Sequence, residues 1–221
     1  MLRKTARLLS AFLLAATVAC NASSAAVKLP SPATDEPLSK SKGQQTLVLA
    51  GGCFWGIQAV FKHVKGVTSA TSGYAGGSAA TAQYETVSTG RTGHAESVRV
   101  VYDPSQVSYG QILQVFFSVA HDPTELNRQG PDDGTQYRSV IFYANDEQKR
   151  IAQAYIDQLN RAKAFSQPIV TQVVPLQAFY PAEDYHQNYA ELHPNQPYIA
   201  INDLPKLGHL KQTLPELYVG K

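Results

Sequence analysis

Apolar residues recur at two regular spacings beyond about residue 45 and predict alternating strands and helices. Short apolar runs rich in β-branched or aromatic residues favour strands, which we expect at 46–50, 94–102, 137–143 and 169–174. Apolar positions three or four residues apart favour helices, which we expect at 53–64, 108–121 and 146–165. Within 94–102, Val98 and Val100 share one face, and Arg99 and Val101 share the other. This mixture predicts packed layers of the α/β or α+β type.

The residues that precede this pattern lack apolar periodicity. Residues 27–45 contain Pro30, Pro32 and Pro37 with several serines and lysines, which is typical of a flexible linker. A chain of 221 residues without internal repeats is long enough for one domain with a short appendage. We therefore expect one folded domain at 46–221, with a sizeable core because 43% of the residues are hydrophobic.

The first 26 residues have the order of a secretory signal peptide. Positive residues come first, an apolar run follows from 8 to 19, and small residues occupy 21–26. The apolar run is shorter than the ~20 residues that a membrane-spanning helix needs. The competing interpretation, an N-terminal core helix, does not explain this order. We therefore expect an exported protein, which in a bacterium would be periplasmic or a membrane-anchored lipoprotein.

Cys20 leaves two processing routes open. The segment Thr17-Val-Ala-Cys20 resembles the lipobox of bacterial lipoproteins, although Leu usually stands where Thr17 is. In that case the signal ends at residue 19 and Cys20 carries a lipid anchor. Cleavage near Ala25 or Ala26 would instead discard Cys20.

Charge and cysteine count exclude several classes of protein. The formal charge of +2 includes three positive and no negative residues within 1–26, so removal of that segment leaves −1. No basic surface for nucleic acid is therefore expected. Two cysteines, Cys20 and Cys53, cannot build a disulfide framework. The histidines lack the close pairing of metal ligands, so no metal site is expected.

Cys53 stands where a helix is expected to begin, directly after a strand and Gly51-Gly52. A helix N-terminus carries a partial positive charge and unpaired N–H groups, which favour a thiolate and lower the pKa of the thiol. The glycines allow a sharp turn that leaves the sulfur open to a substrate. A buried, inert core cysteine is the alternative.

One run of five residues, Gly52-Cys-Phe-Trp-Gly56, is similar to the GCFWG signature of the A-type peptide methionine sulfoxide reductases. The resemblance covers roughly residues 46–200, and its further matches are Ser72-Gly-Tyr-Ala-Gly-Gly77, Gly93-His-Ala-Glu96, His121-Asp-Pro-Thr124, Arg128-Gln-Gly-Pro-Asp132, Gly134-Thr-Gln-Tyr-Arg138 and Tyr180-Pro-Ala-Glu-Asp-Tyr-His-Gln187.

The resemblance implies both a fold and an activity. The fold is α+β, a two-layer sandwich with a mixed, largely antiparallel sheet, flanking helices and a ferredoxin-like core. The activity is reduction of the S epimer of methionine sulfoxide, free or in proteins, through a sulfenic acid intermediate. With export, this implies repair of oxidised exported proteins and makes residues 46–221 the catalytic domain.

The resemblance also gives roles to residues at the centre of the reaction. Cys53 would attack the sulfoxide sulfur, and Glu96 would protonate the departing oxygen, which requires a raised carboxyl pKa. An outward charge on a strand is the competing interpretation for Glu96. Tyr84 and Tyr137 would donate hydrogen bonds to the sulfoxide oxygen. Either could instead be an ordinary core tyrosine.

Four further residues would complete the site. Phe54 and Trp55 would line an apolar pocket for the S-methyl group, or else pack beneath the helix. Asp132 would orient neighbouring groups or water, although a loop turn also explains it. His186 would support the other side chains from behind, and a surface or cap role is the alternative.

One departure from the family pattern bears on how the enzyme is recycled. Many members resolve the sulfenic acid with C-terminal cysteines, and residues 192–221 contain none. We therefore expect no bound cofactor and no intramolecular disulfide, but an external reductant that is thioredoxin-like, glutaredoxin-like or a small thiol. Its partners would then be oxidised protein or free methionine sulfoxide and a thiol reductase. A monomer is expected, since no sequence feature requires assembly.

Two other functions remain open on the sequence. A cysteine hydrolase could use His94, His121 or His186 as the base and would form an acyl adduct. A binding module for oxidised peptides would use the aromatic pocket and would not need Cys53.

Overall fold

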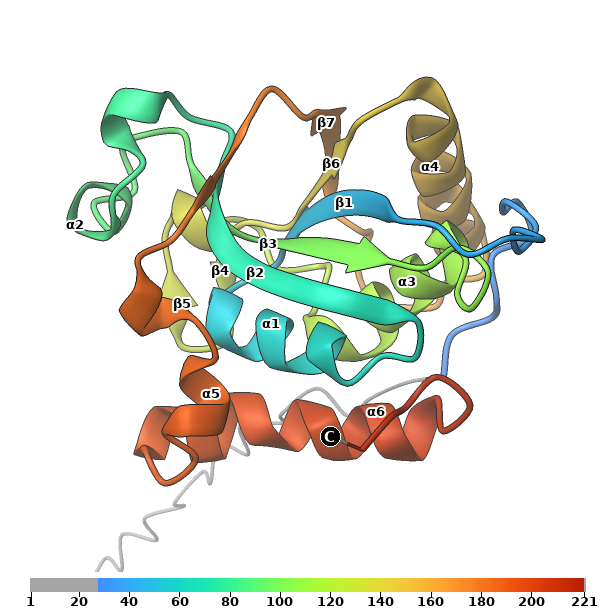
Figure 1. Ribbon diagram of the computed structural model, residues 1–221. Coiled ribbons are helices and arrows are strands. Elements are labelled where there is room, and N and C mark those ends of the chain that lie inside the picture. The colour runs from blue at the N-terminus through green and yellow to red at the C-terminus, as the bar shows by residue number, and fades with distance from the viewer. Residues whose placement is uncertain (1–27, 221) are drawn as a thin grey trace, which may run out of the picture.

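A six-stranded mixed sheet runs through the computed structural model, which describes residues 28–220 (Figure 1). Its order is β7-β6-β1-β3-β2-β8, and only β6 and β7 pair in parallel. The strands are β1 (Gln45–Ala50), β2 (Val67–Ala75), β3 (Ala95–Tyr102), β6 (Val140–Tyr143), β7 (Gln172–Pro175) and β8 (Phe179–Pro181). A separate hairpin joins β4 (Arg128–Gln129) and β5 (Asp132–Asp133).

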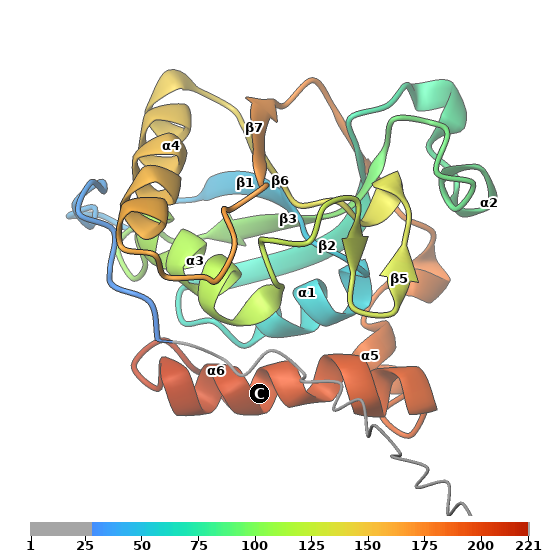
Figure 2. The same ribbon diagram turned by 180° about the vertical axis from the view of Figure 1, so that it is seen from behind.

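Helices cover one face of this sheet and also cross each other. The α-helices are α1 (Phe54–Lys62), α2 (Tyr84–Val87), α3 (Tyr109–Val115), α4 (Asp146–Arg161), α5 (Tyr189–Leu192) and α6 (Leu204–Thr213). The 3₁₀ turns are η1 (Ala79–Thr81), η3 (Thr135–Tyr137) and η4 (Asp184–His186), and the π-helical turns are η2 (Phe116–Ala120) and η5 (Ile199–Asp203). From behind, α1 is seen between the sheet and α6, which forms an outer layer (Figure 2).

The four central strands have the order of a ferredoxin-like core. They are arranged β6-β1-β3-β2, with α1 connecting β1 to β2 and α3 lying between β3 and β6 in the chain. The expected α+β class, with a largely antiparallel mixed sheet and flanking helices, is therefore confirmed. The outer strands β7 and β8 extend this core on its two sides.

Side chains along β1 and β3 alternate between the two faces of the sheet. This alternation divides the core into two clusters and buries a carboxyl group on one of the faces. Leu47 and Leu49 pack in the main cluster with the helices, whereas Val48 and Ala50 join a smaller cluster with Phe142. On β3, Val98 and Val100 belong to the main cluster. Glu96 stands two residues before Val98 and so shares its face, and its side chain is only 3% exposed.

The expected helix beginning at Ser108 has a full capping box. The Ser108 hydroxyl accepts from the backbone N–H of Gln111, and the Gln111 side chain accepts from the Ser108 N–H. This arrangement satisfies two N–H groups that have no partner within the helix. The helix passes into η2 and ends at Ala120, just before His121.

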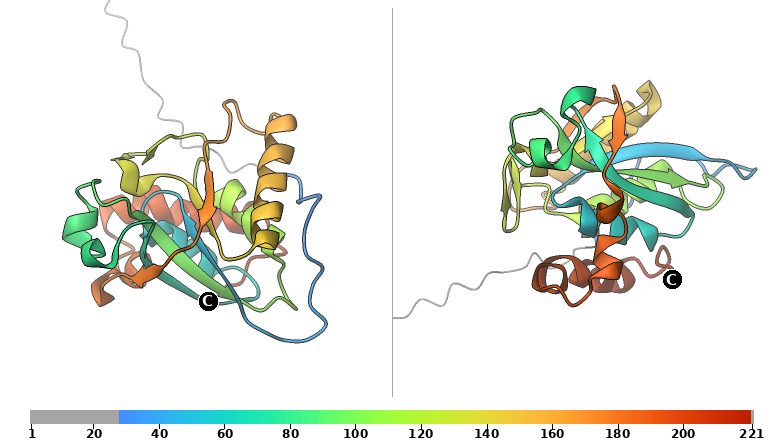
Figure 3. Two further views of the ribbon diagram at one scale, coloured as in Figure 1. Left: turned by 90° about the horizontal axis from the view of Figure 1, so that it is seen from above. Right: turned by 60° about the vertical axis from the view of Figure 1, so that its left-hand side comes forward.

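The first described residues lie against the domain. Leu29 is buried, its carbonyl accepts from Gln114 at 2.8 Å, and the Pro30 carbonyl accepts from Tyr155 at 2.8 Å. Asp35 accepts from the Gly110 N–H at 2.8 Å and so caps α3. Residues 28–44 have no helix or strand, but this part of the expected linker is a packed strap alongside α4 (Figure 3).

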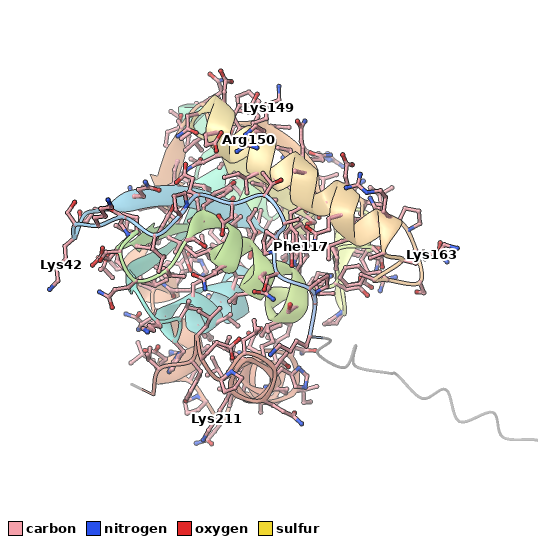
Figure 4. All side chains as sticks on the ribbon, turned by 90° about the vertical axis from the view of Figure 1, so that its right-hand side faces the viewer. Lys42, Phe117, Lys149, Arg150, Lys163 and Lys211 are labelled. Atoms are coloured by element: carbon pink, nitrogen blue, oxygen red, sulfur yellow. The ribbon has the colours of Figure 1, made fainter. Side chains whose placement is uncertain are left out.

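The strap and the helices bury a small aromatic cluster on this side. Phe117 of η2, labelled in Figure 4, packs edge-on against Tyr155 of α4 with ring centroids 5.8 Å apart.

The expected signal peptide, residues 1–26, and Cys20 lie outside the described residues. Within 28–220, no helix combines the length and the apolarity that a membrane crossing requires.

Candidate active site

Cys53 is the N-cap residue of α1 and follows a turn that only glycine permits easily. Gly52 has φ +98°, in the region that side chains disfavour. A Cβ on Gly52 would also lie 2.6 Å from Cγ of Gln129, so the hairpin strand β4 packs directly on the turn. The predicted strand, glycine turn and helix start are thus all present. The sulfur lies at the helix N-terminus, and Cys53 as a whole residue is 9% exposed.

The pKa of Cys53 differs from the expectation. Burial is the largest effect and raises the thiol pKa well above its ordinary value, and the charge of Glu96 raises it further. The charges of Asp203 and Asp132 act in the same direction, whereas the backbone N–H of Trp55 lowers the pKa. The prediction of a lowered pKa was therefore wrong, because burial and three carboxyl groups outweigh the helix N-terminus. Cys53 is a neutral thiol in the free protein.

Glu96 is placed to hold a proton beside Cys53. One carboxyl oxygen of Glu96 accepts from the backbone N–H of Phe54, the residue after Cys53, at 3.1 Å. Burial nevertheless raises the pKa of Glu96 to about 8, and the charges of Asp132 and Asp203 contribute to the rise. At neutral pH this carboxyl group is mostly protonated, so it can donate a proton. The outward-facing alternative for Glu96 is excluded by its burial.

Tyr84, Asp132 and Tyr137 lie around Cys53 and Glu96. The charges of Glu96 and Cys53 raise the pKa of both tyrosines, after the larger effect of burial. Asp132, at the start of β5, also raises the pKa of Tyr137. Two phenolic hydroxyls and two carboxyl groups therefore surround the thiol within the range of direct electrostatic interaction.

His186 lies among the aromatic side chains of the site. Its Nδ1 accepts from the indole N–H of Trp55 at 3.2 Å. Its ring centroid is 5.1 Å from that of Phe54 and 4.4 Å from that of Tyr84. The imidazole is 2% exposed, and burial lowers its pKa. Of the two interpretations of His186, the supporting one fits this position, and the surface one does not.

Three residues of the site were not predicted from the sequence. Tyr198 donates a hydrogen bond to Asp132, and Tyr189 stacks on Trp55 with ring centroids 3.9 Å apart. Glu183 accepts from the Tyr74 hydroxyl at 2.8 Å and from the Tyr84 N–H at 2.9 Å. Glu183 lies inside a matched motif, three residues before His186, and that proximity was the available signal. Tyr189 and Tyr198 stand in a segment without periodicity.

The histidines proposed as hydrolase bases are engaged elsewhere. The ring nitrogens of His94 lie 3.2 Å from the Gly77 N–H and 2.9 Å from the Ser78 carbonyl. His121 lies 2.7 Å from the Ser139 hydroxyl, and burial lowers its pKa to about 4. Neither His94, His121 nor His186 contacts Cys53 by a hydrogen bond. In residues 28–220 no group of acidic, histidine and cysteine side chains is arranged to hold a metal ion.

Comparisons with known proteins agree with this geometry. The sequence model of the family described as PMSR, peptide methionine sulfoxide reductase, matches residues 45–216. The chain is 63% identical over 179 residues to the Mesorhizobium japonicum peptide methionine sulfoxide reductase MsrA 2, covering 81% of this chain and 92% of that one. It is 54% identical over 186 residues to MsrA 2 of Synechocystis, covering 83% and 87%.

Solved structures give the same result. Methionine sulfoxide reductase A of Corynebacterium diphtheriae is 35% identical with a TM-score of 0.60, covering 78% of this chain and 90% of that one. Reduced Mxr1 of Saccharomyces cerevisiae is 31% identical with a TM-score of 0.62, covering 74% and 92%. Together with the site around Cys53, these matches show that the chain belongs to the A-type peptide methionine sulfoxide reductases, oxidoreductases that act on methionine sulfoxide.

Proposed function

We propose that the protein reduces the S epimer of methionine sulfoxide, free or in proteins, through a sulfenic acid on Cys53. The observation that carries this mechanism is the buried Glu96 carboxyl, which accepts from the N–H of Phe54 beside the nucleophile and whose pKa burial raises to about 8. Attack forms a bond from the Cys53 sulfur to the sulfoxide sulfur. The oxygen then passes to Cys53, which becomes the sulfenic acid as methionine leaves.

Glu96 supplies the proton that the sulfoxide oxygen needs during attack. A sulfoxide oxygen gains negative charge as the thiolate approaches, so a neutral acid beside it lowers the barrier. The Tyr84 and Tyr137 hydroxyls stay protonated because their pKa values are raised, and each can donate a hydrogen bond to the same oxygen. The Cys53 thiol loses its proton as its sulfur bonds to the sulfoxide sulfur, and this proton replaces the one that Glu96 gives to the oxygen, which stays on the sulfenic hydroxyl.

The aromatic side chains select the methyl group of the substrate. Phe54 is buried, and Trp55 is held between the stacked ring of Tyr189 and the hydrogen bond to His186. A rigid apolar wall lies on one side of the site and hydrogen-bond donors lie on the other. Together they fix the orientation of the methyl group and of the oxygen on the chiral sulfur. This asymmetry is the basis for a preference for one epimer.

An external thiol returns the enzyme to its starting state. Cys53 is the free cysteine of the described residues. Two equivalents of a thiol would reduce the sulfenic acid to the Cys53 thiol, releasing a disulfide and water. We propose a thioredoxin-like or glutaredoxin-like protein, or a small thiol, as the reductant, and no bound cofactor.

The leader supports an activity outside the cytoplasm. The positive, apolar and small residues of 1–26 support export, with cleavage near Ala26 or lipidation of Cys20 as the two routes. The enzyme would then repair oxidised exported proteins as a monomer. Intact-mass measurement on protein from the membrane and soluble fractions separates the routes, because lipidation adds acyl chains to Cys20.

The test is turnover of the separate S and R epimers of methionine sulfoxide with excess dithiothreitol. Conversion of the S epimer alone, lost in Cys53→Ser, supports reaction, nucleophile and stereochemistry together. Mass spectrometry after one turnover without reductant should find Cys53 heavier by one oxygen. Binding of the sulfoxide without conversion would contradict the proposal and favour a binding module, whereas an acyl adduct on Cys53 would favour a hydrolase.

A further inference from the structure

The segment that carries Tyr84 leaves the sheet after β2 and returns to it at β3. It includes η1 and α2, and α2 stands away from the sheet (Figure 1). Tyr84 is the first residue of α2, so the hydroxyl that the proposed reaction uses is carried on a helix of four residues. A helix this short is not stable by itself, and its position must therefore come from contacts with other elements.

A single hydrogen bond attaches α2 to another element. The backbone N–H of Tyr84 donates to Oε1 of Glu183 at 2.9 Å. Within residues 28–220, the remaining hydrogen bonds of α2 go to its neighbours in the chain, residue 83 and residues 88–90. The ring of Tyr84 also packs on His186, with centroids 4.4 Å apart. The stretch from Glu183 to His186 therefore fixes α2 relative to the active site.

The other oxygen of Glu183 is bound to the rigid core of the sheet. Oε2 of Glu183 accepts from the Tyr74 hydroxyl at 2.8 Å, and Tyr74 is fully buried on β2. Tyr74 stands directly opposite Glu96 in the pairing of β2 with β3. Residues opposite each other in an antiparallel pair project to the same face of the sheet. The carboxylate that holds Tyr84 is thus itself held by the cross-strand neighbour of the proposed acid.

Glu183 uses its charge in these hydrogen bonds. Within the described part of the chain no lysine or arginine pairs with it, and Nε2 of His186 lies 4.0 Å away. Burial raises the pKa of Glu183, but the hydrogen bonds from the N–H groups of Tyr84 and Glu183 and from Tyr74 outweigh it and bring the pKa below its ordinary value. An ionised carboxylate accepts hydrogen bonds that are about twice as strong as those between neutral groups.

We propose that Glu183 is a positioning residue, which joins the buried strand β2 to α2 and so holds the Tyr84 hydroxyl in a fixed relation to Glu96 and Cys53. Glu183 makes no hydrogen bond to either of these two groups and acts through Tyr84. The catalytic consequence rests on the proposed reductase function, whereas the anchoring of α2 does not.

The first test measures the anchor directly and needs no turnover. Amide hydrogen exchange of the full-length protein is followed by NMR, and the exchange rate of the Tyr84 N–H is compared between variants. Glu183→Ala should speed this exchange by about tenfold or more, with the amides of β1 unchanged. Glu183→Gln keeps an oxygen that can accept and should stay within about threefold of the parent. Asp184→Asn, which removes the exposed neighbouring carboxylate, is the matched control and should have no effect. An unchanged Tyr84 rate in Glu183→Ala overturns the proposal.

The second test connects the anchor to catalysis. Glu183→Ala should lower kcat for methionine sulfoxide about tenfold with KM within about threefold of the parent, because the Tyr84 hydroxyl acts on charge that develops during attack. Glu183→Gln should recover most of this loss. In a Tyr84→Phe background, Glu183→Ala should cause no further loss, since the hydroxyl that it positions is absent.

The outcomes of the two tests are distinguishable. Equal losses from Glu183→Ala in the parent and in Tyr84→Phe would show a general structural role and would refute positioning through Tyr84. An inactive parent in which the Tyr84 amide still responds to Glu183→Ala would refute the reductase function and support the anchoring of α2.

Discussion

The indole N–H of Trp55 donates to Nδ1 of His186 at 3.2 Å, and this bond links α1 to η4 across 131 residues of sequence. Because Nδ1 must carry a lone pair to accept, the proton of neutral His186 is on Nε2. That nitrogen is buried, lies 4.0 Å from the Glu183 carboxylate and has no hydrogen-bond partner among the described residues. His186 therefore fixes the orientation of Trp55 only while the imidazole is neutral.

Protonation of His186 should release Trp55. Burial lowers the His186 pKa, so the bond should persist at neutral pH and be lost as the pH falls below about 6.5. Trp55 is the only tryptophan, so the fluorescence reports on the surroundings of this one side chain, and His186→Phe separates the contribution of the bond. We expect an emission change with a midpoint below 6.5 that is absent in His186→Phe and retained in His209→Phe. His186→Phe should also lower kcat/KM about tenfold, the value of one buried hydrogen bond.

The pH dependence of activity should follow Glu96 on its alkaline side. Glu96 acts in its protonated form, so kcat/KM should fall as the pH rises through about 8. Glu96→Gln cannot give a proton and should lose about 10²–10³-fold at pH 7, with no fall near pH 8. Glu85→Gln, which removes an exposed carboxylate of α2, is the matched control. A parental profile that stays flat from pH 6 to 10 would argue against Glu96 as the acid.

The stability of the fold should depend on pH through Glu96, and the raised pKa of Glu96 fixes the direction of this dependence. The pKa of Glu96 is raised in the folded protein, so the folded state binds more protons than the unfolded state between pH 4.5 and 8. The free energy of unfolding therefore falls with rising pH in this window. Burial lowers the pKa of His121 from 6.5 to about 4, so its contribution has the opposite sign, fades above 6.5 and is the same in both proteins. Urea unfolding between pH 6.5 and 8 should show a smaller slope against pH in Glu96→Gln than in the parent.

The core strands and helices could be predicted from periodicity, and β2 could not. Strands β1 and β3 and helices α1 and α4 begin within one residue of their expected starts. Strand β2 is the longest of the sheet, but it consists mainly of small and polar residues such as Ser69, Thr71 and Ser72. Its position depends on pairing with β3 and β8 on both sides, which is a tertiary interaction and leaves no alternation in the sequence.

The site residues were found by motif, but the direction of the Cys53 pKa shift was not. The seven other candidates lie around Cys53, and the thiol pKa depends on burial and on Glu96, Asp132 and Asp203, which are far apart in sequence. A rule that considers only the helix N-terminus leaves out the effect of these three carboxyl groups. Tyr198 was missed for a related reason, because the segment that continues into η5 reaches the site only through its packing on α1.

Cys53 should react slowly with alkylating agents in the free enzyme. Its pKa is raised by burial and then by Glu96, so little thiolate exists at pH 7. The rate of iodoacetamide modification, followed by intact mass, should rise with pH and reach its midpoint above 9. Removal of one negative charge in Glu96→Gln should move that midpoint downward. Rapid modification at pH 7 would instead favour the helix N-terminus as the dominant effect.

The same glycine-to-alanine substitution should change the stability in opposite directions at Gly52 and at Gly208. Gly52 has φ +98°, and its Cβ would meet Gln129 at 2.6 Å, so Gly52→Ala should destabilise the fold by about 2 kcal/mol. Gly208 lies within α6, and no atom comes within 4 Å of its Cβ position. Since alanine loses less backbone freedom in a helix, Gly208→Ala should stabilise by about 0.5–1 kcal/mol. Urea unfolding of both variants measures the difference, and equal changes would show that the turn before Cys53 is not strained against the β4–β5 hairpin.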